Sequence, residues 1–95
     1  MKFHLLIVDD EVVIRKGLSD YINWDAYDCQ FTAAASNGKE AIEIIENNNI
    51  DIVLTDIKMP VLDGIGLAEY VYENHPDIAV IILSGYSEFE YAQSA

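Results

Sequence analysis

Polar side chains with the potential for chemistry follow three of the apolar runs in this sequence. Asp9 and Asp10 come after the first run, Asp56 ends a later one, and Ser84 follows the last. If these runs are parallel strands, their carboxyl ends lie along one edge of a sheet, which is where ligands bind in open α/β folds. We therefore expect three carboxylates and a hydroxyl group to meet at this edge.

Three carboxylates in one place repel one another and raise each other's pKa unless a cation compensates. Hard oxygen ligands with room for water suit Mg²⁺, and a carboxylate neutralised by a metal can attack phosphorus as a nucleophile. The residues therefore predict a Mg²⁺ site with Asp56 as candidate nucleophile. The structural alternative is that Asp9 and Asp10 only begin a helix, where the dipole favours acidic side chains.

Four apolar runs predict the strands that must position this site, at residues 3–8, 29–35, 50–56 and 78–83. Strands that read as continuous apolar runs are typical of parallel sheets covered on both faces. The segments between them are too long for hairpins and predict right-handed helical crossovers. The fold class is therefore a doubly wound α/β sheet, with 29–35 as a weak strand at its edge.

Capping and helical periodicity place the helices between these strands. The first runs from 11 to about 22 and is closed by residues 23–25. The second begins at the capping box of Asn37 and Glu40. Asp63 caps the third, which ends before Pro76. A fourth begins at a capping box of Ser87 and Glu90. The inward-facing residues are expected to be Ile14, Leu18, Tyr21, Ile22, Ala41, Ile44, Ile45, Leu67, Tyr70 and Val71.

Composition narrows the range of partners. The 95 residues are 52% hydrophobic and carry 17 acidic against 5 basic side chains, for a net charge of −12. Such a chain is expected to fold as one domain and to repel phosphate backbones, which argues against direct contact with nucleic acid. The apolar run at 5–8 is too short to span a membrane, and a single cysteine, Cys29, permits no intrachain disulfide. We expect a cytoplasmic protein with a structural Cys29.

The same residues resemble the receiver domains of two-component response regulators. The resemblance rests on Asp9-Asp10, on the run Leu-Thr-Asp-Ile-Lys-Met-Pro-Val-Leu-Asp-Gly at 54–64, and on Ser84-Gly85. It covers the whole chain in order. The stretch 85–92 (Gly-Tyr-x-x-Phe-x-Tyr-Ala) is similar to the subgroup that precedes AraC-type helix-turn-helix output regions. The resemblance implies a flavodoxin-like topology with strand order 2-1-3-4 and residues 1–95 as a single receiver domain.

The resemblance also implies roles for individual residues. Asp56 would accept a phosphoryl group from a sensor histidine kinase. Asp10, Asp56 and the backbone carbonyl of Lys58 would bind Mg²⁺ directly, and Asp9 would hold it through water. Ser84 would hydrogen-bond the phosphoryl group as a switch, and Tyr86 would tune access of water to it. Phosphorylation adds about −1.5 to −2 charge, which is enough to order a nearby hydroxyl-bearing loop.

The sequence departs from the family pattern at its end, because the fifth strand with its lysine and the fifth helix are absent. The fourth strand would then form an open apolar edge, which invites pairing with another chain. We expect either that the sequence is part of a longer regulator carrying a DNA-binding output domain, or that a homodimer or strand-swapped oligomer covers this edge. Without the lysine, the site lacks the cation that would pair with the phosphoryl group, and we expect less efficient phosphorylation.

Two other functions fit the sequence less well. One is a protein-interaction module that works without phosphorylation, which the missing lysine favours and the acidic triad opposes. The other is a small-molecule phosphatase with an aspartate nucleophile. Such enzymes usually need a second carboxylate two residues on as general acid, and that position is Lys58. His4 and His75 are expected to be structural. We therefore expect no enzyme activity beyond self-phosphorylation and self-dephosphorylation.

Overall fold

A computed structural model of the chain describes residues 2–83. In this part of the chain four parallel strands form one sheet in the order β2-β1-β3-β4. The strands are β1 (Phe3–Val8), β2 (Cys29–Ala35), β3 (Ile52–Asp56) and β4 (Ala79–Leu83), and the helices are α1 (Val12–Tyr21), the 3₁₀ helix η1 (Trp24–Tyr27), α2 (Gly38–Asn47) and α3 (Gly64–Asn74). The predicted doubly wound sheet with strand order 2-1-3-4 is confirmed.

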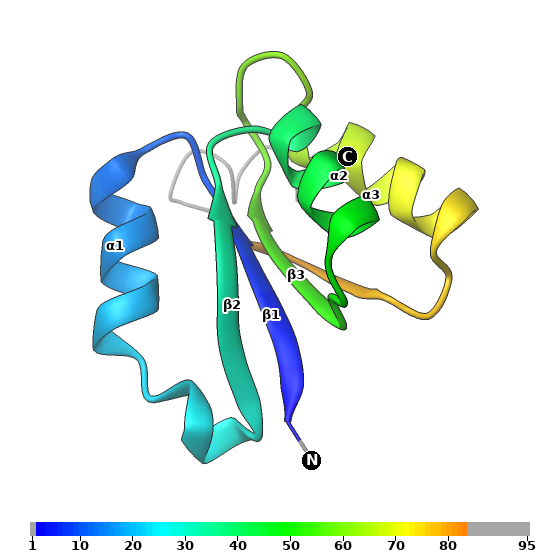
Figure 1. The fold of residues 1–95 in the computed structure, drawn as a ribbon. Coiled ribbons are helices and arrows are strands. Elements are labelled where there is room, and N and C mark those ends of the chain that lie inside the picture. The colour runs from blue at the N-terminus through cyan, green and yellow to red at the C-terminus, as the bar shows by residue number, and fades with distance from the viewer. Residues whose placement is uncertain (1, 84–95) are drawn as a thin grey trace.

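The helices lie on both faces of the sheet. Figure 1 shows α1 and η1 on one side, and α2 and α3 side by side on the other. The larger core cluster lies under α2 and α3 and includes Leu6, Val53, Leu67 and Val71. Each such side chain contributes about 1.5–3 kcal/mol when fully buried. Buried side chains of this cluster, Leu6 and Val8 on β1 and Val53 on β3, lie on the two strands that end at the acidic residues.

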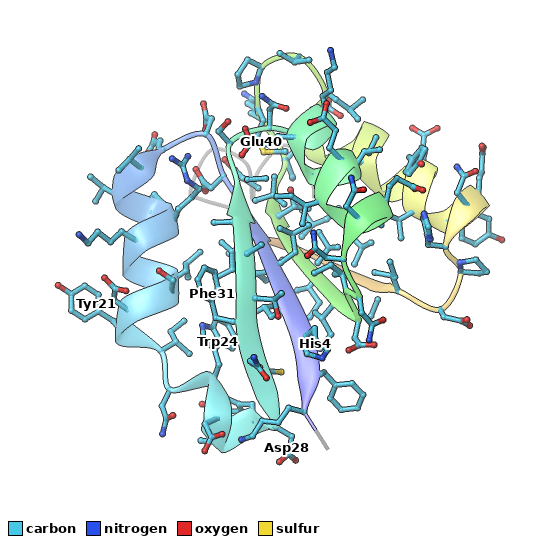
Figure 2. All side chains as sticks on the ribbon, viewed as in Figure 1. His4, Tyr21, Trp24, Asp28, Phe31 and Glu40 are labelled. Carbon is cyan, nitrogen blue, oxygen red and sulfur yellow. The ribbon has the colours of Figure 1, made fainter. Side chains whose placement is uncertain are left out.

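The face under α1 differs from the sequence prediction. Tyr21 was expected to face inward, but it is 89% exposed and points away from the sheet (Figure 2), and none of the residues of α1 is buried. Trp24 packs against the second core cluster of Leu5, Ile7 and Leu54 instead, together with Leu18. Its indole N–H donates to the carbonyl of Leu18 at 2.8 Å. Residues 24–27 therefore form a separate short helix and do not simply close α1.

Both edge strands agree with the sequence analysis. β2 is one edge, as predicted, and Cys29 at its start is buried. Among the described residues β4 pairs only with β3, and it leaves Ile81 49% and Ile82 37% exposed. β3 and β4 begin at Ile52 and Ala79, two residues and one residue later than predicted. The helix expected from Ser87 lies outside the described residues.

The predicted helix caps are present, with one difference. The side chain of Asn37 accepts a hydrogen bond from the N–H of Glu40, and that of Asp63 accepts one from the N–H of Gly66, each at 2.8 Å. The Glu40 carboxylate, however, accepts from the backbone and hydroxyl of Ser36 and not from the N–H of Asn37. The reciprocal half of the capping box is therefore displaced by one residue.

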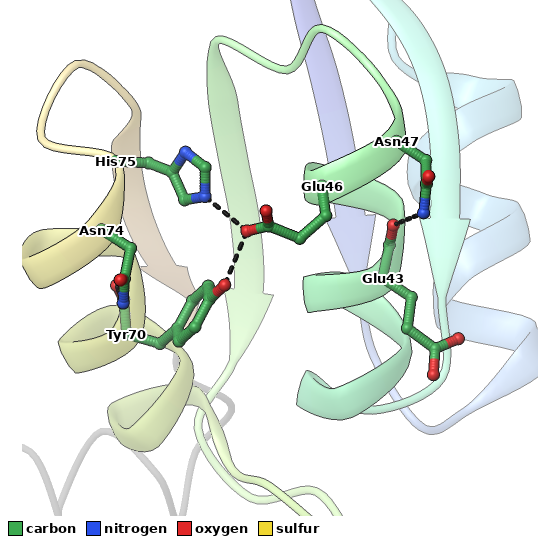
Figure 3. Close-up of polar contacts among 6 residues, drawn as sticks. All are labelled: Glu43, Glu46, Asn47, Tyr70, Asn74 and His75. Carbon is green, nitrogen blue, oxygen red and sulfur yellow. Dashed lines mark hydrogen bonds and ion pairs between the residues drawn. The ribbon is translucent and has the colours of Figure 1, made fainter.

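A polar cluster joins α2 to α3. One oxygen of Glu46 accepts hydrogen bonds from the hydroxyl of Tyr70 and from Nε2 of His75, both at 2.6 Å (Figure 3). These bonds hold the pKa of Glu46 below its usual value, with the Tyr70 bond as the larger cause, and the same bond raises the pKa of Tyr70. His75, which was expected to have a structural role, contacts Glu46 and lies outside the acidic cluster of Asp9, Asp10 and Asp56.

Candidate functional site

The three acidic residues singled out in the sequence come together at the carboxyl edge of the sheet. Asp9 and Asp10 follow β1, and Asp56 ends the neighbouring strand β3. One carboxylate oxygen from each of the three lies within 4.8 Å of the others. Asp9 is buried, Asp56 is half-buried and Asp10 is exposed, so the cluster opens to solvent on the Asp10 side. A ligand can approach from there.

Asp9 is held by three hydrogen bonds. Its N–H donates to the carbonyl of Ala35 at 3.1 Å, its Oδ1 accepts from the N–H of Glu11 at 2.9 Å, and its carbonyl accepts from Nη1 of Arg15 at 2.7 Å. Burial raises the pKa of Asp9, the Glu11 hydrogen bond partly opposes this, and the nearby negative charge of Asp56 adds to the rise. A bound cation would reverse these effects.

Asp56 is positioned by the strand and by the turn behind it. Its Oδ1 accepts a hydrogen bond from the N–H of Ile57 at 2.8 Å. The hydroxyl of Thr55, which is fully buried, donates to the Asp56 carbonyl at 3.0 Å. The N–H of Gly64 donates to the carbonyl of Ile57 at 2.8 Å, which closes the loop back onto the strand end. The carboxylate therefore projects from a fixed backbone.

The loop of residues 57–63, between the end of β3 and the start of α3, has a backbone geometry that the sequence did not predict. Val61 has φ 72°, a left-handed conformation that is unusual for a β-branched residue and costs about 1–3 kcal/mol. The carbonyl of the next residue, Leu62, accepts a hydrogen bond from the N–H of Gly38 at 2.9 Å. The start of α2 thus holds the loop that carries Lys58.

The structure describes Lys58 but not the other two predicted site residues, Ser84 and Tyr86. Lys58 is exposed and lies two residues after Asp56, and its backbone carbonyl stays a predicted ligand. Ser84 and Tyr86 lie outside the described residues, so their roles also stay predictions. Arg15 was not predicted as a site residue, although its side chain donates to the Asp9 carbonyl. Its contact with Asp9 depends on how α1 leaves the sheet, and no sequence pattern signals it.

The donor set fits Mg²⁺. Carboxylate oxygens are the ligands this ion prefers, and it usually takes one or two of them and keeps several waters. Asp10 and Asp56 can bind it directly from two adjacent strand ends, while Asp9 lies deeper in the cluster. Burial and the charges of Asp56 and Asp10 raise the pKa of Asp9, so the cluster disfavours negative charge at that position. A divalent cation would relieve that repulsion.

Comparison with known protein families assigns this chain to a family. Residues 5–95 match the family model of the response regulator receiver domain. The chain belongs to the response regulator receiver family. Its acidic cluster occupies the strand ends at which the sequence resemblance placed the phosphoacceptor site.

Relatives of this receiver domain include transcriptional regulators. It is 40% identical to the uncharacterized transcriptional regulatory protein YesN of Bacillus subtilis, over 98% of this chain and 25% of YesN. It is 39% identical to the transcriptional regulatory protein HptR of Staphylococcus aureus, over 97% of this chain and 36% of HptR. The chain therefore spans about a quarter to a third of the length of these relatives.

Solved structures show the same fold. The receiver domain of AraT, a response regulator from Geobacillus stearothermophilus, superposes with a TM-score of 0.90 at 38% identity, covering 100% of this chain and 74% of that one. A two-component transcriptional regulator, AraC, from Clostridium phytofermentans gives 0.82 at 41% identity, covering 99% and 73%. The CheX–CheY–BeF3–Mg complex from Borrelia burgdorferi gives 0.80 at 32% identity, covering 96% and 68%.

Within residues 2–83, no helix is both long and apolar enough to cross a membrane.

Proposed function

We propose that this receiver domain is a phosphoacceptor, in which Asp56 takes a phosphoryl group from a phosphohistidine of a sensor histidine kinase. The observation that carries the proposal is the approach of Asp9, Asp10 and Asp56 oxygens to within 4.8 Å of one another at the open edge of the sheet. This is the placement that a metal-assisted attack on phosphorus requires.

The transfer exchanges one bond to phosphorus for another. A carboxylate oxygen of Asp56 attacks the phosphorus atom in line, an O–P bond forms, and the N–P bond to the kinase histidine breaks. The imidazole leaves with the electron pair of that bond and with the proton on its other nitrogen, while the product on Asp56 is an acyl phosphate. Because Oδ1 of Asp56 accepts the Ile57 N–H, the carboxylate is already fixed in orientation before the donor arrives.

In this proposal Asp10, Asp56 and the Lys58 carbonyl would hold Mg²⁺, and Asp9 would hold it through water. When bound, Mg²⁺ supplies positive charge that offsets the carboxylates and the oxygens of the transferring group. The solved relative CheY, in the CheX–CheY–BeF3–Mg complex, supports this choice of ion. The contribution of Asp9 is indirect: burial and the charge of Asp56 raise the pKa of its carboxyl group, and a bound cation would offset this effect and favour the ionised form.

We further propose that the domain reports to a transcriptional output in a longer, cytoplasmic regulator, because YesN and HptR are transcriptional regulators of greater length. Ser84 would hydrogen-bond the phosphoryl group and carry the switch, and Tyr86 would limit its hydrolysis. With a net charge of −12 the domain itself repels DNA, so contact with DNA belongs to the output region. Its own chemistry is limited to gaining and losing the phosphoryl group.

The test is incubation with Mg²⁺ and a small-molecule phosphodonor, followed by intact-mass spectrometry. The wild-type chain is expected to gain one phosphoryl group, and the gain is expected to disappear when EDTA replaces Mg²⁺. Asp56→Asn is expected to gain none, since the amide is no nucleophile. A full gain in Asp56→Asn would overturn the proposal.

A further inference from the structure

Arg15 reaches from α1 back to the acidic cluster. Its Nη1 donates a hydrogen bond to the backbone carbonyl of Asp9 at 2.7 Å, and its side chain is half-buried. This carbonyl belongs to the peptide group that joins Asp9 to Asp10. The orientation of this peptide group is one of the factors that set the direction of the Asp10 side chain.

The helix itself gives no reason for a cation at this position. Arg15 is in the first turn of α1, where its N–H donates to the carbonyl of Glu11. The helix dipole favours anions at this end, so a basic residue here does not stabilise the helix. None of the residues of α1 is buried, so packing does not anchor this turn either. Two contacts with Asp9 tie the start of α1 to the site: the N–H of Glu11 donates to its carboxylate, and the Arg15 side chain donates to its carbonyl.

Replacing a partner's side chain can remove only one of the three hydrogen bonds of Asp9. Those with Ala35 and Glu11 use backbone groups of the partner residues and survive side-chain replacement. The bond from Arg15 is made by a side chain. Arg15 is therefore the residue through which the geometry of the Asp9–Asp10 peptide can be changed while both carboxylates are kept.

We propose that Arg15 is a positioning residue for Mg²⁺: it holds the Asp9–Asp10 peptide so that the Asp10 carboxylate faces Asp56. This inference rests on the metal site of the proposed function. For the replacement of Arg15, it predicts a change in Mg²⁺ affinity opposite to the change expected from the loss of a positive charge. A positive side chain near the site repels Mg²⁺, so removal of its charge alone would tighten binding. Removal of a positioning contact weakens binding, and residues that orient metal ligands typically contribute 10–100-fold in affinity.

The experiment measures Mg²⁺ affinity by titration of the backbone amide NMR signals of Asp10, Glu11 and Ile57. Arg15→Met keeps a long apolar side chain and removes the donor, and it is expected to weaken Mg²⁺ binding by about tenfold. Lys16→Met removes the same charge from the next residue, which is exposed, and is expected to change the affinity by less than about twofold. Arg15→Lys restores a donor and is expected to recover most of the wild-type affinity.

Each outcome bears on the inference. Binding that is unchanged or tighter in Arg15→Met overturns it, as does an equal loss in Lys16→Met. Should Arg15→Met unfold, Arg15→Ala replaces it: a loss of about tenfold supports the role, and unchanged or tighter binding contradicts it. If the wild type binds Mg²⁺ but takes up no phosphoryl group, the proposed phosphoacceptor function fails while the role of Arg15 stands. A wild type that binds no Mg²⁺ overturns both.

Discussion

Gly64 packs directly against the backbone of Asp56. A Cβ atom at position 64 would overlap the Asp56 carbonyl oxygen and lie 3.0 Å from its carbonyl carbon. The same glycine donates its N–H to the Ile57 carbonyl. The first residue of α3 and the strand end that carries the candidate nucleophile are thus in backbone contact, and no side chain fits between them.

Gly64→Ala is therefore expected to displace Asp56. Overpacking of this kind costs about 1–3 kcal/mol in the free energy of unfolding, which urea denaturation would measure. Gly17→Ala is the matched control, because its Cβ would meet only the Tyr21 ring at 3.9 Å. In the interior of α1 that change is expected to stabilise the fold by about 0.5–1 kcal/mol. Equal effects of the two substitutions would contradict the close contact at Gly64.

The hydrogen bonds of Glu46 to Tyr70 and His75 (the Glu46 cluster) predict how the free energy of unfolding falls at acid pH, in the part of the curve called here the acid limb. The pKa of Glu46 is held below its ordinary value of 4.5, chiefly by the Tyr70 hydroxyl. The folded state therefore favours the ionised carboxylate, and its contribution to stability is present above pH 4.5 and is lost as pH falls through the lowered pKa. Glu46→Gln is expected to flatten this part of the curve of unfolding free energy against pH.

Glu43→Gln serves as the control for that measurement. Glu43 is on the same helix, and its carboxylate points away from the contact between α2 and α3 (Figure 3). The substitution removes the same charge and is expected to leave the acid limb as steep as in the wild type. A curve of wild-type shape in Glu46→Gln would show that the cluster contributes nothing to acid stability.

The edge of β4 predicts self-association. Ile81 is 49% exposed on a strand that pairs, within residues 2–83, only with β3. We expect the 95-residue chain to form dimers or larger species at high concentration, seen by light scattering. Ile81→Lys is expected to shift the chain to monomer while it changes the free energy of unfolding by no more than about 0.5 kcal/mol, as for other surface substitutions. A folded wild-type monomer at all concentrations would contradict this.

Much of the fold could be predicted because it is encoded locally. The bounds of β1 and β2, the cap at Asp63 and the carboxylate-bearing strand ends all follow from short patterns of apolar, acidic and turn residues. The convergence of Asp9, Asp10 and Asp56 then follows from parallel strands and from the strand order implied by the family resemblance, which places β1 beside β3.

What could not be predicted depends on tertiary geometry. Tyr21 has the periodicity of an inward-facing residue, yet Trp24 takes the place against the sheet that Tyr21 was expected to fill. The Glu46 cluster joins residues 24 and 29 positions apart, and the contact of Arg15 with Asp9 depends on the path of one loop. Helical spacing shows which residues share a face but not which other segment covers that face.

The measurement that tests the central claim most directly is to locate the phosphoryl group. After phosphorylation in Mg²⁺, borohydride reduces an acyl phosphate to an alcohol and so converts a phosphorylated aspartate to homoserine, which peptide mass spectrometry identifies. We predict homoserine at position 56 and aspartate retained at positions 9 and 10. Homoserine at 9 or 10, or a phosphorylated chain with none at 56, would contradict the assignment of Asp56 as the phosphoacceptor.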